Sequence, residues 1–197
     1  MQDEHVFRLI LVFGCALLIP IALYHRLKAA ASGESLNRRT EGLFMLLTLR
    51  PVAIVGILGL IAYLVNPNWM AWSSVPLPSW LRWFGVGLGV IAGALLISVF
   101  RTLGTNITDT VVTRIKHTLV TRGPYRWVRH PFYIAYGLSV VANALVTANW
   151  FLGLTGAIAF VLLAIRSRTE EEKLIERFGD EYRTYMTRTG RFFPRIR

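Results

Sequence analysis

The sequence predicts an all-α polytopic membrane protein, with about five transmembrane helices and a C-terminal amphipathic helix at the interface. Three observations support this fold class. Hydrophobic residues make up 54% of the 197 residues and charged residues only 17%, against about 25% charged residues in a typical soluble domain. Long apolar runs recur along the chain, and the mean hydropathy is +0.47. The basic residues gather in alternate connections between these runs.

The first three apolar runs cover residues 6–24, 43–65 and 81–100. Each is close to the length of about 20 residues that a helix needs to cross a bilayer. A signal peptide is an alternative for the first run, but such a peptide begins with basic residues. Asp3 and Glu4 stand there instead, so we interpret the run as a membrane helix.

Within the third run, glycines stand at every fourth position: Gly85, Gly89 and Gly93. Small residues at this spacing let two helix backbones approach closely. We therefore expect this side of the helix to pack against a neighbouring helix.

The fourth and fifth runs cover residues 132–148 and 151–165, with a turn at Asn149 and Trp150. They predict a tight helical hairpin. The fifth run is short for a span, at about 22 Å for a helical rise of 1.5 Å per residue, so we expect its helix to tilt little or to begin inside this turn.

Beyond the fifth run, residues 169–189 carry apolar side chains at spacings of three and four, which indicate one face of a helix. These side chains are Leu174, Phe178, Tyr182 and Tyr185. Thr169 and Glu172 have the spacing of a capping box. The pattern predicts a separate amphipathic helix that begins at Thr169 and lies on the membrane surface or against the rest of the protein.

The net charge of +11 follows from connections 25–42 and 101–131 and from the tail 166–197, whereas residues 66–80 contain no Lys or Arg. The positive-inside rule then places the N-terminus outside and the C-terminus in the cytoplasm. Because this distribution explains the basic charge as a topology signal and an attraction to membrane lipid, we expect no nucleic-acid partner.

Polar residues crowd beside the apolar helices at residues 117–133, which read HTLVTRGPYRWVRHPFY, and at residues 168–172, which read RTEEE. A hairpin between the two segments returns them to the same membrane face. Pro131 suits the first turn of a helix, so His130 stands just before that helix. Taken alone, these residues name no reaction: His130 can be bonded to backbone, the acids can cap a helix, and no metal site is indicated.

These two segments, followed by FGDEY at residues 178–182, resemble the isoprenylcysteine carboxyl methyltransferase family of integral membrane enzymes. They also resemble, more loosely, the phospholipid methyltransferases. The resemblance covers residues 100–195. It implies a single domain over residues 1–197, in which residues 1–100 form three spans on the substrate side and residues 101–197 hold the cofactor-binding loop, the hairpin and the C-terminal helix.

The resemblance implies S-adenosyl-L-methionine as the methyl donor, bound at the cytoplasmic interface. It assigns the adenosine and the rest of the cofactor pocket to one set of residues: His117, Thr118, Leu119, Val120, Tyr125, His130 and Tyr133. One acid of the run 170–172, with Glu172 as the first choice, would hold a polar group of the cofactor. Arg168 would position the acceptor, a lipid-linked or prenylated molecule such as the carboxylate of an isoprenylcysteine.

Three alternatives stay open at this stage. An amine on a phospholipid headgroup is a second type of acceptor, which would need a base to remove its proton. A sterol-reductase-like protein that binds NADPH shares part of the C-terminal pattern. A non-enzymatic scaffold is the third, because Thr113 and Ala135 stand where the family usually has Gln and Gly.

Overall fold

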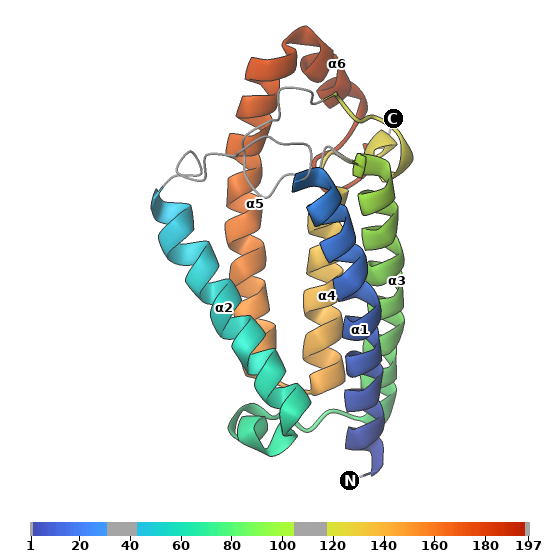
Figure 1. Ribbon diagram of the computed structural model, residues 1–197, viewed down its shortest axis with the longest axis vertical. Coiled ribbons are helices and arrows are strands. Elements are labelled where there is room, and N and C mark those ends of the chain that lie inside the picture. The colour runs from blue at the N-terminus through green and yellow to red at the C-terminus, as the bar shows by residue number, and fades with distance from the viewer. Residues whose placement is uncertain (1, 31–42, 105–117, 196–197) are drawn as a thin grey trace.

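The computed structural model describes residues 2–30, 43–104 and 118–195, and Figure 1 shows these residues as a bundle of long helices. No β-strand occurs within these ranges. Each of the five predicted apolar runs forms a helix, so the predicted all-α membrane fold is confirmed. The elements in chain order are α1 (Gln2–Ala30), α2 (Leu43–Val65), η2 (Pro67–Ser73), α3 (Ser79–Leu103), η4 (Gly123–Arg126), α4 (Pro131–Thr147), α5 (Trp150–Phe178) and α6 (Asp180–Arg188).

In the described part of the chain, four helices are long and apolar enough to cross a membrane: α1, α2, α3 and α5. The short apolar helix is α4, with 17 residues. The helix of the fifth run begins at Trp150, inside the predicted turn, as one of the two expectations had it. It is longer than its apolar run, because α5 continues for 29 residues from Trp150 to Phe178.

The expected helix start at Thr169 is also wrong. Thr169 and Glu172 both lie inside α5, which ends at Phe178. The helix continues because the residues after 165 are mostly Glu, Lys, Arg and Leu, which have high helix propensity. The break falls at Gly179, where φ is +55°, a backbone conformation that glycine adopts without steric cost. The amphipathic helix α6 follows and buries Tyr182 and Tyr185.

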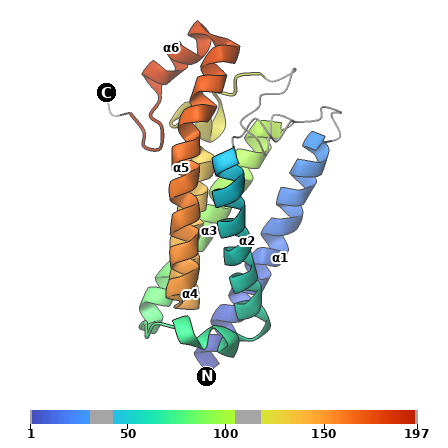
Figure 2. The ribbon, with the colours of Figure 1, turned by 90° about the vertical axis from the view of Figure 1, so that its left-hand side faces the viewer.

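The helices divide the molecule into two ends. Figures 1 and 2 both show the N-terminus, η2 and the α4–α5 turn at one end, which we call the turn end. Helix α6 and the C-terminus lie at the other, the α6 end. The predicted hairpin turn is confirmed, because Ala148 adopts the left-handed conformation and the Asn149 side chain caps α5 by accepting from the Leu152 N–H (3.1 Å).

The glycines of α3 permit close helix packing, as their spacing predicted. A Cβ atom on Gly85 would lie 2.7 Å from the Cβ of Leu145 in α4, and one on Gly89 would lie 3.7 Å from the Cβ of Ala142. The expectation is confirmed, and these close contacts join α3 to the last turns of α4, near the turn end.

At the turn end, the buried Arg82 side chain of α3 joins four helices. Its Nε and Nη2 donate to the carbonyl oxygen of Val146 in α4 at 3.0 and 2.6 Å. Its Nη1 lies 2.7 Å from Oε2 of Glu4 in α1, and the hydroxyl of Tyr63 in α2 donates to the other Glu4 oxygen. These bonds satisfy a charge that the apolar bundle could not otherwise hold.

We expect Arg82→Ala to lower the free energy of unfolding by about 3 kcal/mol. This is the lower end of the range for breaking a buried ion pair, because Glu4 is 37% exposed. Unfolding in detergent, followed by circular dichroism, measures the loss. Arg101→Ala, an exposed position on the same helix, is the control and should change stability by no more than about 0.5 kcal/mol. Equal effects of the two variants would contradict the role given to Arg82.

Candidate functional site

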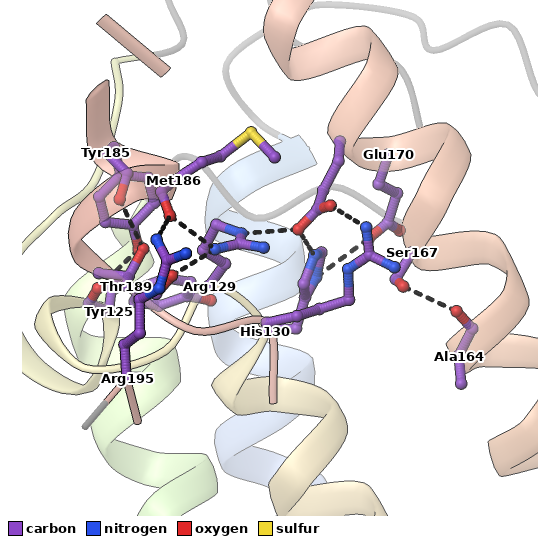
Figure 3. A network of polar contacts seen from close by, with 12 residues as sticks. Tyr125, Arg129, His130, Ala164, Ser167, Glu170, Tyr185, Met186, Thr189 and Arg195 are labelled. Atoms are coloured by element: carbon purple, nitrogen blue, oxygen red, sulfur yellow. Dashed lines mark hydrogen bonds and ion pairs between the residues drawn. The ribbon is translucent and has the colours of Figure 1, made fainter. Parts of the chain in front are cut away.

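The two polar segments singled out from the sequence meet at the α6 end of the bundle. Residues 118–130 lead through η4 to the start of α4, and the last turns of α5 extend beyond the apolar part of the bundle beside them (Figure 3). Pro131 occupies the first turn of α4, as predicted, and His130 is the residue before it. The hairpin therefore brings His130 to the acids of α5.

The buried carboxylate of Glu171 is the centre of this site. Its Oε1 accepts from the Nε of Arg129 at 2.7 Å and lies 3.3 Å from the Nε2 of His130. Its Oε2 accepts from the guanidinium of Arg191, in the segment after α6. Glu171 is only 3% exposed, so these cations compensate a negative charge that water does not reach.

A second acid faces the other side of the same imidazole. Oε2 of Glu170 lies 3.7 Å from the Nδ1 of His130, and its Oε1 lies 3.2 Å from the Nε of Arg166 one turn earlier on α5. The ring of Tyr133 stacks on His130, with centroids 5.2 Å apart and planes 5° apart. The imidazole thus lies between two carboxylates, and a protonated imidazole can donate to both.

Tyrosines close the side of the site next to α6. The hydroxyl of Tyr185 donates to the carbonyl oxygen of Tyr125 at 2.6 Å, which joins α6 to η4. Burial raises the pKa of Tyr185 to about 12. Burial also raises the pKa of Tyr125 and of Tyr182 well above the usual tyrosine value. All three hydroxyls are therefore protonated at neutral pH and act as neutral groups.

The structure brings together only part of the predicted set. His130 and Tyr133 are buried and in ring contact, and Tyr125 lies beside them in η4. Of the predicted adenosine-lining residues, Thr118 is exposed, whereas Leu119 and Val120 are half-buried. His117 and Thr113 lie outside the described residues.

Two predicted residues lie away from this cluster. Arg168 and Glu172 are both exposed on α5. The residues that occupy the corresponding places in the site are Arg166 and the pair Glu170 and Glu171.

The phase of α5 separates the side chains that face this cluster from those that do not. Along the apolar run the buried positions are Leu152, Thr155 and Ala159. At about 100° per residue, their face continues to Arg166 and Glu170 and excludes Arg168 and Glu172. Arg191 has no comparable signal, because it follows a turn whose direction the sequence pattern does not set.

The model of the isoprenylcysteine carboxyl methyltransferase family matches residues 85–176. Over this segment, just under half of the chain, the sequence matches that family. This family segment, residues 85–176, contains the site residues of α4 and α5 but ends before Arg191. Those residues are His130, Tyr133, Arg166, Glu170 and Glu171. The resemblance found in the sequence is therefore confirmed.

Individual relatives agree with the family assignment. The chain is 32% identical over 130 residues to protein-S-isoprenylcysteine O-methyltransferase of Mus musculus, covering 64% of this chain and 46% of the relative. It is 34% identical over 70 residues to methanethiol S-methyltransferase of Mycobacterium tuberculosis, covering 36% of this chain and 28% of the relative. The chain thus spans just under half the length of the isoprenylcysteine relative.

A solved structure shares the fold. The structure of the eukaryotic intramembrane Ras methyltransferase of this family superposes with a TM-score of 0.54 and 22% identity, covering 75% of this chain and 52% of that chain. Together with the four apolar helices, this likeness supports an integral membrane protein. Within residues 2–30, 43–104 and 118–195, no three His, Cys, Asp or Glu side chains come together as metal ligands.

We expect Glu171→Gln to destabilise the protein and Glu172→Gln to leave it nearly unchanged. The first substitution leaves the guanidinium groups of Arg129 and Arg191 without their shared counter-charge, which costs about 3–5 kcal/mol for a buried pair. The second changes an exposed side chain, with an effect within about 0.5 kcal/mol. Thermal unfolding in detergent compares the two variants. A larger loss for Glu172→Gln would mean that α5 is rotated relative to this structure.

Proposed function

We propose that this protein transfers a methyl group from S-adenosyl-L-methionine to a lipid-linked acceptor, the carboxylate of an isoprenylcysteine or a similar molecule. The observation that carries this proposal is the cluster of the buried His130, Tyr133 and Glu171 with the half-buried Glu170. It lies at one end of an apolar helical bundle and falls within the family segment. A polar site in this position can receive a charged donor from water and an apolar acceptor from the bilayer.

The residues of the cluster suit this donor. S-adenosyl-L-methionine presents an aromatic base and an ammonium group, and when bound it supplies an electrophilic methyl group on a sulfonium. Tyr133 and His130 offer stacked rings, and Tyr125 with residues 118–120 extends the wall towards η4. Glu170 and Glu171 are the acids beside His130. We assign to Glu170 the cofactor contact that the sequence pattern suggested for Glu172, because Glu171 is already held by two arginines.

A carboxylate acceptor makes modest demands on the protein. It is ionised at neutral pH, so no residue has to remove a proton, and the site has mainly to align the reacting groups. Good alignment contributes about 7–11 kcal/mol in comparable reactions. Arg166 is the guanidinium next to Glu170 and is only 12% exposed. We therefore assign acceptor positioning to Arg166 in place of Arg168, since a guanidinium can hold both oxygens of a carboxylate.

A small thiol is a second candidate acceptor, favoured by the likeness to methanethiol S-methyltransferase. A thiol must lose its proton before it attacks the methyl group, because the thiolate is the nucleophile. His130, placed between two carboxylates, is the residue that could take this proton. The acceptor class therefore decides whether His130 acts only in binding or also as a base.

We also propose that the α6 end faces the cytoplasm and the turn end faces outward. The charge distribution supports this orientation, because the connection 66–80 has no Lys or Arg and the tail has many. Exposed tryptophans gather near the turn end, as expected for residues at a membrane–water interface. They are Trp69, Trp72, Trp80, Trp83 and Trp150.

The function is tested by supplying labelled S-adenosyl-L-methionine with a farnesylcysteine analogue, a small thiol or phospholipid vesicles. We expect methyl transfer to the farnesylcysteine carboxylate. His130→Ala and Tyr133→Ala should each weaken donor binding by about 1–3 kcal/mol, or about 5- to 150-fold in Kd, in isothermal titration. Tyr24→Ala, an exposed aromatic position on α1, is the control.

Transfer to phospholipid alone would identify the amine acceptor, and transfer to the thiol alone would establish the second candidate. Binding of NADPH in place of S-adenosyl-L-methionine would overturn the methyltransferase proposal. The absence of binding to either cofactor would favour the non-enzymatic scaffold.

The orientation is tested with single cysteines in a Cys15→Ser background. Asn68 in η2 and Thr187 in α6 are both exposed. We expect an impermeant thiol reagent added outside intact cells to label Asn68→Cys and not Thr187→Cys, whereas permeabilised cells should show labelling at both. The reverse pattern in intact cells would place the site outside.

A further inference from the structure

The segment after α6 folds back over the candidate site. We define residues 189–195 as the C-terminal strap. Its backbone runs beside residues 127–130, because the N–H of Arg129 donates to the carbonyl oxygen of Gly190 at 2.9 Å and the N–H of His130 donates to that of Arg191 at 3.1 Å. Figure 3 shows Thr189 beside Arg129, whose guanidinium donates to the carbonyl oxygen of Thr189. The strap is therefore attached directly to the residues that lead into α4.

Two strap side chains reach the centre of the site. The guanidinium of Arg191 binds Oε2 of Glu171. The ring of Phe192 lies 5.8 Å from that of His130 and 6.3 Å from that of Tyr133, measured between centroids. Phe192 thus contacts both rings assigned above to the donor, whereas the next residue, Phe193, is 82% exposed.

The strap turns back on itself at a position that only glycine can occupy. A Cβ atom on Gly190 would lie 1.6 Å from the carbonyl oxygen of Phe193, a distance that no side chain tolerates. The fold of the strap therefore depends on Gly190, independently of the Arg191 ion pair. This gives two separate ways of disturbing it.

We propose that the C-terminal strap forms the outer wall of the donor site and that Arg191 is the positioning residue that keeps it closed. The proposal rests on the function proposed above and extends it to residues outside the family segment, which ends at residue 176. Arg191 acts through Glu171 and does not itself touch the reacting atoms. Phe192 supplies the ring that covers His130 and Tyr133, and the donor enters and leaves when the strap moves away.

The contacts of the strap are suited to opening without loss of the fold. The side chain of Arg191 is 36% exposed, whereas that of Arg129, which binds the other oxygen of Glu171, is 9% exposed. Because the Arg191 guanidinium is partly hydrated while it binds Glu171, releasing it costs less than releasing the buried guanidinium of Arg129. When it opens, Glu171 keeps its bond to Arg129, and the buried charge stays compensated.

The experiment compares Arg191→Gln with Arg195→Gln. Arg195 lies in the same strap and donates to the carbonyl oxygen of Thr187 at 2.7 Å, but it does not contact Glu171. Hydrogen exchange of a peptide covering residues 127–133 reports strap closure, because the amides of Arg129 and His130 are protected by strap carbonyls. The dissociation rate of S-adenosyl-L-methionine from the full chain reports whether the closed strap retains the donor.

We expect Arg191→Gln to speed the exchange of these two amides and the dissociation of the donor by about tenfold or more. Arg195→Gln should change neither, and Arg191→Lys should recover part of both. Gly190→Ala should reproduce the effect of Arg191→Gln while leaving the guanidinium in place.

Faster exchange with unchanged donor dissociation would overturn the proposal, since the strap would then open without controlling the donor. Unchanged exchange in both Arg191→Gln and Gly190→Ala would overturn it as well. Failure of the parent protein to bind the donor would overturn the proposed function and this extension together. Normal donor binding by the parent without methyl transfer would contradict the proposed function. The effect of Arg191→Gln on donor dissociation would still test the role of the strap.

Discussion

The carboxylate of Glu171 is the interaction on which the arrangement of the α6 end depends. A buried negative charge beside an apolar bundle is stable only when cations surround it closely. Those cations are Arg129, which precedes His130, and Arg191 of the C-terminal strap. A single acid on α5 therefore fixes the entry to α4, the direction of α6 and the return of the chain end. The candidate site lies at this three-way junction.

The sequence was sufficient for the parts of the fold that depend on the bilayer. Apolar length and turn residues located all five apolar helices and the hairpin at Asn149, and the placement of His130 before Pro131 was correct. Local patterns failed where the choice depended on tertiary contacts. Thr169 and Glu172 have capping spacing, but a cap forms only where a helix begins, and the surrounding Glu, Lys and Leu residues favour continuing it.

The same limitation explains why the sequence motif did not select all the residues of the candidate site. Motif position alone did not separate the exposed Glu172 from Glu170 and Glu171, or the exposed Arg168 from Arg166. Successive residues on a helix point about 100° apart, so only part of such a run faces the bundle. The buried stripe of α5 carries that information in the sequence. The position of Arg191 does not follow from any periodicity, since it depends on a glycine turn at residue 179 and on a second close turn at Gly190.

The shortness of α4 has a consequence for the candidate site. Its 17 residues span about 25 Å, less than the hydrocarbon thickness of about 30 Å in an ordinary bilayer. The neighbouring α5 has 29 residues and continues past the start of α4. His130 therefore meets the side of α5, at Glu170 and Glu171, and not its end. Under the proposed function, the difference in length between the two helices is what gives the donor a polar helix side to bind against.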